Sequence, residues 1–310
     1  MTLILAHFLT RSIVEPVHRL QKAMRQVAGG DFSTRAQLND NNELGHLGDH
    51  FNRMTAELRE RFELRRTLAL AREVQQTLLP RQDPQLPGLE MAGRSIYCDE
   101  TGGDYWDYLL PERDGEGAVG IAVGDVSGHG LPSALLMASV RAGLRQRVAM
   151  GGDIGAVITD VNRQFSLDAE SSGNFMTLFY LSIDRPAERL EWVRAGHDPA
   201  LLYDPREDRF EHLKGSGVAL GVDAEGAYRT FARNGLTEGQ VILLGTDGIW
   251  EARTPAGEML GKAPVRRLLR QQSHRSASEI VAALAKLVQQ FVGAGRTEDD
   301  LTMVVVKIVP

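Results

Sequence analysis

Four short motifs in the chain each place aspartate at the end of an apolar segment of strand length. They are GGDYWD with Asp104, VGIAVGDVSGHG with Asp125, VILLGTDG with Asp247, and RTEDDLTMVVV with Asp299 and Asp300. Carboxylates at strand ends can converge on one rim of a sheet, where they repel one another unless cations neutralise them. An all-oxygen cluster selects a hard cation. The motifs therefore predict Mg²⁺ or Mn²⁺, and they disfavour zinc because no Cys/His cluster has ligand spacing.

Each motif is weak by itself, because an Asp-Gly pair is most often a turn and a strand-terminal DDLT can cap one. The stretch CDETGGDYWDYLL (98–110) also resembles half of the GGDEF signature of diguanylate cyclases. A cyclase needs a second acid directly after its glycines and first acid, whereas Tyr105 and Trp106 follow Asp104 here. All four motifs in this order are harder to explain as turns, so the metal site is the favoured interpretation.

The composition sets limits on the class of protein. A chain of 310 residues with 43% hydrophobic and 25% charged residues can hold about two globular domains. A net charge of −6 argues against a nucleic-acid-binding protein. The single cysteine, Cys98, permits no internal disulfide and fits a reducing compartment.

The amino terminus, MTLILAHFLTR, is an apolar run that ends at Arg11. It is too short to span a bilayer, and no stretch of about 20 apolar residues exists elsewhere. We expect residues 1–10 to be the inner end of a transmembrane helix, which would place the chain on the cytoplasmic face of the membrane. A frayed or partner-packed helix start is the alternative.

Two short heptad patterns follow, joined by a polar linker of about 14 residues. The spacing of each pattern is that of a coiled-coil seam, and two such hairpins from two chains would form a parallel four-helix bundle. The region resembles the HAMP domain of membrane receptors over residues 11–62. The resemblance rests on Pro16, GGDF (29–32), NELG (42–45) and FNRM (51–54). The seam residues are Ile13, Val17, Leu20, Met24 and Val27, then Leu44, Leu47, Phe51, Met54 and Leu58.

The heptad spacing in residues 63–80 predicts a coiled-coil linker helix. Leu64, Leu68, Ala71, Gln75 and Leu78 continue a heptad spacing, but in a register that does not follow from Leu58. We favour a dimer stalk that carries a signal; a solvated spacer helix is the alternative. Prolines at positions 80, 84 and 87 end the helix.

The remaining residues, 81–310, predict one domain of the α+β class. Seven strand-length apolar segments alternate irregularly with helical stretches at 131–147, 153–167, 263–271 and 277–292. Because strands and helices do not alternate one for one, a doubly wound parallel sheet is disfavoured. We expect antiparallel sheets covered by helices.

The whole set of motifs resembles the PPM family of metal-dependent Ser/Thr phosphatases related to protein phosphatase 2C. It is most similar to the bacterial branch of the sporulation stage II protein E phosphatase and of sigma-factor partner switching. The resemblance covers residues 68–309 and implies an antiparallel β-sandwich flanked by helices. It rests on LALAREVQQTLLP, GGDYWDY, GDVSGHGLPSALLMA, FMTLFYLSID, AGHDPALLY, LGTDGIWEA and DDLTMVVVK.

Carried onto this sequence, the resemblance implies a centre of two Mg²⁺ or Mn²⁺ ions. Asp125 would bridge both ions, with the carbonyl of Val126 as a further ligand. Asp104, Asp247 and Asp299 would complete the site. Asp300 is the alternative to Asp299, which is favoured by alignment on the Leu-Thr that follows.

The neighbouring residues would shape the loops. Gly103 forms part of the turn before Asp104, Thr246 and Gly248 flank Asp247, and Gly128 and Gly130 allow close backbone approach. His129 would either protonate the leaving oxygen or only fix the loop geometry. His197 is expected to be structural, and Asp107 to support the centre from behind.

The implied function is dephosphorylation of a phosphoserine or phosphothreonine protein, expected to be a small anti-anti-sigma-type regulator. The chain would be the cytoplasmic output of a membrane receptor and a homodimer through its HAMP domain and stalk. The helix that starts at Leu131 could relay movements of the stalk to Asp125. The main alternative is an idle module of the same fold that only binds a partner; a stalk joined to an unrelated hydrolase is a third.

Overall fold

The computed structural model describes residues 2–38, 42–98, 101–110, 118–186, 188–293, 295 and 297–310. The chain divides into two compact units, residues 1–70 and 71–310. The boundary falls within the long helix α3 (Glu43–Leu78), which is continuous. The predicted change of seam register therefore causes no break in the helix.

The amino-terminal unit is a helical hairpin. Helix α1 (Thr2–Leu9), a π-helical segment (Thr10–Val14) and α2 (Glu15–Ala28) form its first arm, and the first part of α3 forms the second. The side-chain amide of Asn52 ties the connection down, because it donates to the carbonyl of Ala36 at 3.0 Å and accepts from its N–H at 2.8 Å. No described helix has the length and apolar content needed to cross a membrane.

Each predicted seam of this hairpin has both buried and half-exposed members within one chain. Its small core consists of Leu20, Ala23, Val27, Ala36, Leu38 and Phe51. Met24, Leu47 and Met54 belong to the same seams but remain about half exposed, at 52%, 48% and 47%. The hairpin therefore buries one side of its apolar pattern and leaves the other side uncovered.

The carboxy-terminal unit contains two five-stranded antiparallel sheets. One has the order β1-β10-β9-β6-β7 and the other the order β2-β3-β4-β5-β8. The first sheet consists of β1 (Leu89–Ile96), β10 (Leu301–Ile308), β9 (Val241–Gly245), β6 (Ala200–Asp204) and β7 (Arg209–Leu213). The second consists of β2 (Asp104–Leu109), β3 (Ala118–Val126), β4 (Met176–Asp184), β5 (Arg189–Ala195) and β8 (Phe231–Asn234).

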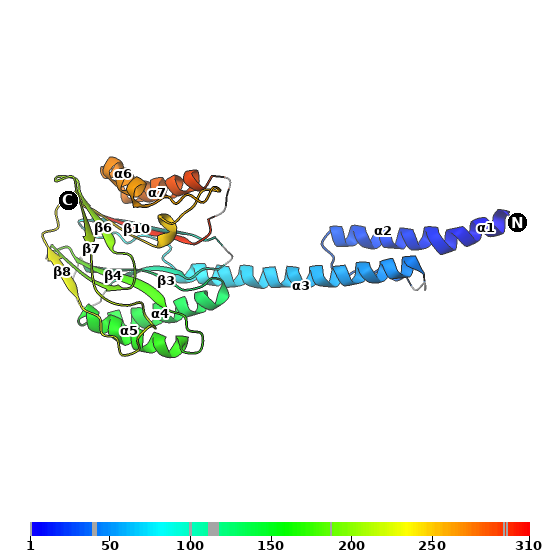
Figure 1. Cartoon of the computed structure of the whole chain (residues 1–310), viewed down its shortest axis with the longest axis horizontal. Helices are drawn as coiled ribbons and strands as arrows, with labels where there is room; N and C mark the ends of the chain where they lie inside the picture. Colours follow the sequence, from blue (N-terminus) through cyan, green and yellow to red (C-terminus); the bar gives the residue numbers. More distant parts are fainter. Residues whose placement is uncertain are drawn as a thin grey trace. The chain divides into compact units, whose positions relative to one another are not determined.

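Helices cover the outer face of each sheet (Figure 1). Helices α4 (Leu131–Ala149) and α5 (Ile154–Ala169) pack on the second sheet, and α6 (Lys262–Gln272) and α7 (Ala277–Val292) lie over the first. The α+β class, the antiparallel sandwich and all four predicted helices are confirmed. Strands β2, β7 and β8 were not predicted, because β2 carries two aspartates and β7 and β8 are short and partly exposed.

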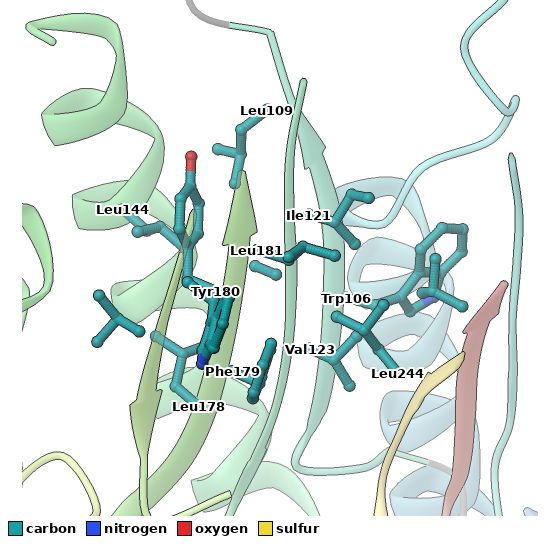
Figure 2. Close-up of a cluster of buried hydrophobic side chains, with 14 of the residues drawn as sticks. Trp106, Leu109, Ile121, Val123, Leu144, Leu178, Phe179, Tyr180, Leu181 and Leu244 are labelled. Atoms are coloured by element: carbon teal, nitrogen blue, oxygen red, sulfur yellow. The ribbon is translucent and has the colours of Figure 1, made fainter. Parts of the chain in front are cut away.

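The core fills the space between the sheets and the space under α4 and α5. Trp106, Val123 and Leu244 pack in one cluster that joins β2, β3 and β9 (Figure 2). Strand β3 reads as a nearly continuous apolar run because both of its faces are covered. Gly93 is required beneath Trp106, since a Cβ there would lie 2.1 Å from the indole ring.

Candidate metal centre at one end of the sandwich

The four acidic motifs come from both sheets and meet at the same end of the sandwich. Asp104 begins β2 and is paired in register with Asp125, near the end of β3. Asp247 follows β9, and Asp299 and Asp300 directly precede β10, which is paired with β9. The antiparallel register thus brings together residues that are up to about 200 positions apart in the sequence.

A threonine links the two sheets beneath this acidic group. The hydroxyl of Thr246 donates to Oδ2 of Asp104 at 3.0 Å and accepts from the N–H of Thr302 at 3.1 Å. The N–H of Thr246 donates in turn to the carbonyl of Thr302 at 3.0 Å. Asp104 is only 1% exposed, so these bonds hold its carboxylate in one place.

The electrostatics show that the carboxylates are close and not internally neutralised. Burial, and then the charge of Asp125, raises the pKa of Asp104 well above its usual value. Burial, and then the charges of Asp299 and Asp247, raises the pKa of Asp125 to about 8. The pKa values of Asp247 and Asp299 are also raised, in each case chiefly because the carboxyl group is partly removed from water although the residue as a whole is exposed, and further by the charge of a neighbouring aspartate. Such mutual destabilisation of the charged forms is what a bound cation would relieve.

Glycines allow the loops to approach closely. A Cβ on Gly103 would lie 2.5 Å from the carbonyl oxygen of Val126, and one on Gly248 would lie 2.0 Å from the carbonyl oxygen of Asp300. Gly128 and Gly130 have φ values of +88° and +78°, which other residues adopt only with strain. These four positions therefore require glycine for the geometry of the centre.

Asp299 and Asp300 occupy different environments although they are adjacent. Asp300 is 5% exposed and its Oδ1 accepts from the N–H of Cys98 at 2.9 Å. Asp299 is exposed, and its Oδ1 accepts from the N–H of Asp300 at 2.8 Å. Asp300 therefore fixes the neighbouring loop, whereas Asp299 is the more accessible carboxylate.

A cavity of about 380 Å³ opens beside the acidic group. Asp125, His129 and Asp299 line it, and His129 lies close enough to Asp299 to oppose the rise in the pKa of that carboxyl. Asp104 and Asp247 are not among the lining residues. Among the residues that the structure describes, Cys98, Thr101, Gly103, Gly128, Glu298 and Asp300 also line the cavity.

The donor set fits a hard divalent cation, although its side chains are not already arranged around one. In the described part of the chain, no three His, Cys, Asp or Glu side chains form a ready-made metal-binding group. The acids nevertheless share one end of the sandwich, interact electrostatically and offer only oxygen atoms as ligands. The carbonyl oxygen of Val126, which lies close to Gly103, is a further oxygen donor there. Mg²⁺ and Mn²⁺ prefer such ligands.

Two predicted residues lie away from the cavity. Asp107 is fully buried, and the Arg145 guanidinium bonds both of its oxygens at 2.6 Å, so it fixes α4 to β2. His197 is buried, and burial lowers its pKa to about 4. One ring nitrogen of His197 pairs with the Thr177 hydroxyl at 2.8 Å, and the other lies 3.1 Å from the carbonyl of Gly245.

One contact at this end of the sandwich was not predicted. Gln75, assigned to the linker seam from its spacing, is buried against the backbone of Gly102. The signal in the sequence was the amide itself, because glutamine is an unusual residue in an otherwise apolar seam.

Comparisons with known proteins agree with this architecture. The sequence profile of the family described as Stage II sporulation protein E (SpoIIE) matches residues 115–309, and that of the HAMP domain matches residues 8–60. Phosphoserine phosphatase RsbU of Bacillus subtilis is 29% identical over 249 residues, which are 79% of this chain and 71% of RsbU.

Solved structures share the fold. The SiaA-PP2C domain of Pseudomonas aeruginosa superposes with a TM-score of 0.70 at 22% identity, covering 80% of this chain and 98% of that domain. RsbX, solved in complex with magnesium, gives a TM-score of 0.54 at 15% identity over 73% of this chain and 98% of its own. At these identities the likeness concerns the fold.

Proposed function

Because the chain belongs to the stage II sporulation protein E (SpoIIE) family, we propose that residues 71–310 are a metal-dependent phosphatase acting on phosphoserine or phosphothreonine in a protein. The observation that carries the proposal is the meeting of Asp104, Asp125, Asp247 and Asp299 at one end of the sandwich, where their pKa values are raised together. The relative RsbU, named a phosphoserine phosphatase, supports the class of substrate.

The chain's own residues would hold two divalent cations, Mg²⁺ or Mn²⁺. Asp125 would hold them with the carbonyl of Val126 as a further ligand, and Asp104, Asp247 and Asp299 would be the other acidic ligands. When bound, the ions supply a hydroxide at neutral pH and neutralise the phosphoryl oxygens. The hydrogen bond from Thr246 holds the carboxylate of Asp104 in place and so supports this role.

The leaving oxygen of the substrate needs a proton, and a residue that lines the cavity can donate it. His129 lines the same cavity as Asp125 and Asp299. We assign it the role of giving a proton to the serine or threonine oxygen as that oxygen leaves. Gly128 and Gly130 set its position through backbone conformations that suit glycine. If His129 only fixes the loop, His129→Asn will slow the reaction equally for substrates with good and poor leaving groups.

The amino-terminal unit contains a HAMP domain, and we propose that it passes a signal to the phosphatase within a homodimer. The half-exposed Met24, Leu47 and Met54 support a second hairpin as the partner. HAMP domains belong to membrane receptors, so we place the chain at the cytoplasmic face of a membrane. A small anti-anti-sigma-type phosphoprotein is the proposed substrate.

Phosphate release tests the proposal. The full chain is incubated with a phosphoserine peptide in Mn²⁺, in Mg²⁺ and with chelator, beside Asp125→Asn. We expect turnover that requires the metal and that the substitution abolishes. Turnover in the presence of chelator would contradict the proposal, as would turnover by Asp125→Asn at the wild-type rate. Absence of turnover on peptides and on a phosphorylated partner protein would favour the idle binding module.

A further inference from the structure

Helix α6 is basic in a protein that is acidic as a whole. The net charge of the chain is −6, whereas α6 contains one lysine, three arginines and no acid. Lys262, Arg266 and Arg270 are four positions apart and so lie on one side of the helix, which we call the cationic face. Val265 and Leu269 are buried in the core that joins α6 to the first sheet, so the helix is held firmly beneath this face.

The cationic face begins beside the candidate metal centre. Nζ of Lys262 lies 4.5 Å from the centre of the Trp250 ring, and the N–H of Gly261 donates to the carbonyl of Trp250 at 2.8 Å. Trp250 comes three positions after Asp247. Lys262 also pairs with Asp198 at 2.9 Å. Burial raises the pKa of Asp247 and the charge of Asp198 adds to the rise, so the two acids are close. A protein bound at the centre would therefore contact this end of the face.

The middle of the face has more hydrogen-bond donors than acceptors. Nη2 of Arg266 donates to Nε2 of His212, because a guanidinium group cannot accept. Burial, and then the charges of Arg266 and Lys262, lower the pKa of His212, so its ring is neutral and carries its hydrogen on Nδ1. That nitrogen and Nε of Arg266 are buried and have no acceptor among the residues that the structure describes. Their unpaired dipoles add to the positive potential of the face.

The far end of the face combines charge with an aromatic ring. The guanidinium carbons of Arg266 and Arg270 lie 5.9 and 5.4 Å from the centre of the Phe210 ring. The side chain of Arg270 is 51% exposed, and that of Lys262 at the near end is 40% exposed. Both cations are thus accessible to a partner. Arginine and aromatic side chains are enriched where proteins bind one another.

The charges around the face indicate which partner it fits. The first and last of its cations each pair with an acid, Asp198 and Asp208. No acid of the described residues forms an ion pair with Arg266 between them. Acids at both ends of the face would repel a uniformly anionic surface such as a membrane, whereas a protein segment can place its carboxylates between them. Eight helical positions span about 12 Å, which roughly four residues of extended chain would cover.

We propose that the cationic face, together with Phe210 and Trp250, is a docking surface for an acidic segment of the substrate phosphoprotein. The segment would lie next to the phosphorylated residue, which enters the metal centre beyond Trp250. The proposal rests on the phosphatase function proposed above and names the chemistry by which the enzyme selects its substrate. An acidic partner is repelled by most of this acidic protein, so a local basic face directs how it binds.

The test compares two double variants of the full chain that change the net charge equally. Arg266→Gln with Arg270→Gln removes two cations of the cationic face. Arg267→Gln with Arg275→Gln removes two exposed arginines outside it, since Arg267 lies about 100° further round α6 than Arg266. Three substrates are used with Mn²⁺: a phosphoserine peptide with glutamates in both flanks, a twin peptide with glutamines in their place, and an aryl phosphate.

The wild type should prefer the glutamate peptide to its twin by about tenfold in kcat/KM, because partly exposed ion pairs are modest in energy. The preference should lie in KM and shrink as the salt concentration rises. Arg266→Gln with Arg270→Gln should abolish it and leave turnover of the aryl phosphate within about twofold of wild type, because the metal centre is untouched. Arg267→Gln with Arg275→Gln should retain it.

A wild type without the preference, or one whose preference both double variants retain, would overturn the proposal. So would an equal loss on all three substrates together with a lower thermal midpoint, which would show a purely structural role. If the first double variant does not fold, Arg270→Gln alone must still reduce the preference relative to Arg267→Gln alone.

Direct binding lets the docking surface and the phosphatase fail separately. It is measured by fluorescence anisotropy of the labelled glutamate peptide. Binding that Arg266→Gln with Arg270→Gln weakens, in a chain that releases no phosphate, would support the docking surface and contradict the phosphatase. Metal-dependent phosphate release with equal peptide binding in both double variants would do the reverse. Loss of binding to phosphatidylglycerol vesicles with peptide binding unchanged would make the face a membrane-binding surface and overturn the proposal.

Discussion

Asp104 and Asp107 lie three positions apart on strand β2 and are both buried, at 1% and 0% exposure, yet their surroundings are opposite. Asp107 is paired by the Arg145 guanidinium, and the Tyr105 hydroxyl also donates to it. Asp104 faces another carboxylate, Asp125, and its hydrogen-bonding neighbours Thr246 and Thr302 are uncharged. The strand thus carries one acid that the protein neutralises itself and one that, in the proposed centre, a bound cation would neutralise.

The difference shows that burial alone does not tell whether a carboxylate has a structural or a functional role. A buried carboxylate with its own cationic partner is part of the packing, whereas a buried carboxylate facing others is a functional candidate. The predictions below test this distinction, from the largest expected effect to the smallest.

The largest effect is expected from neutralising the acid at the centre of the repelling group. Asp125→Asn should lower kcat/KM by at least about 1,000-fold, because in the proposed centre Asp125 would contribute to holding both cations. The same variant, in chelator at pH 8, should unfold at a higher temperature than wild type, since a repelling charge is gone. Calorimetric melting checks this, and a lower midpoint in chelator would contradict the account.

Substitution of the adjacent acids Asp299 and Asp300 should have different effects, because Asp299 is exposed and Asp300 is buried. Asp299→Asn should weaken Mn²⁺ binding and lower kcat/KM by roughly 10- to 100-fold, because it removes an accessible ligand. Asp300→Asn should chiefly reduce thermal stability, because a neutral amide oxygen accepts from the N–H of Cys98 more weakly than a carboxylate does. Calorimetric titration of both variants measures the contrast, and a larger loss of Mn²⁺ affinity in Asp300→Asn would reverse the assignment.

Removing the internally neutralised acid should affect stability and leave metal binding intact. Asp107→Ala should lower the free energy of unfolding by about 2–3 kcal/mol, because it breaks a buried ion pair. Arg145 is 45% exposed and can turn to solvent, which places the cost at the lower end of the range for such pairs. Urea unfolding measures the loss, and unchanged stability would show that the pair contributes little.

The smallest effect concerns the stability of the metal-free chain against pH. The pKa of Asp125 is about 8 in the folded state and 3.8 in the reference state. The folded state therefore binds the proton more tightly, and stability should rise as pH falls below about 9, by at most about 1.4 kcal/mol per pH unit. Urea unfolding in chelator between pH 9 and pH 7 measures this. A slope that is equally steep in Asp125→Asn would rule out Asp125 as its source.

The opposite sign is expected from His197 at lower pH. Its pKa is about 4 in the folded state and 6.5 in the reference state, so its contribution to stability is lost as pH falls from about 6.5 to 4. The two effects oppose each other between about pH 6.5 and 4, whereas only the Asp125 effect acts between pH 9 and 7.

Much of the fold could be predicted from the sequence because its longest segments have strong patterns. The apolar run of β3 and the helix that begins at Leu131 are examples, and the aspartates at their ends follow from the same patterns. The different surroundings of Asp104 and Asp107 could not be predicted. They depend on the ion pair of Asp107 with Arg145, which comes from α4 and lies 38 positions after Asp107 in the sequence. Gln75 was misassigned because heptad spacing does not reveal that the helix face docks on the Gly102 turn.

The most direct test of the account counts the cations bound by each chain. Calorimetric titration of the purified full chain with Mn²⁺ should give two ions per chain for the wild type, and weak or no binding for Asp125→Asn. Asp107→Ala should still bind two. The account would be contradicted if the wild type bound no Mn²⁺, or if Asp107→Ala lost the ions while Asp125→Asn retained them.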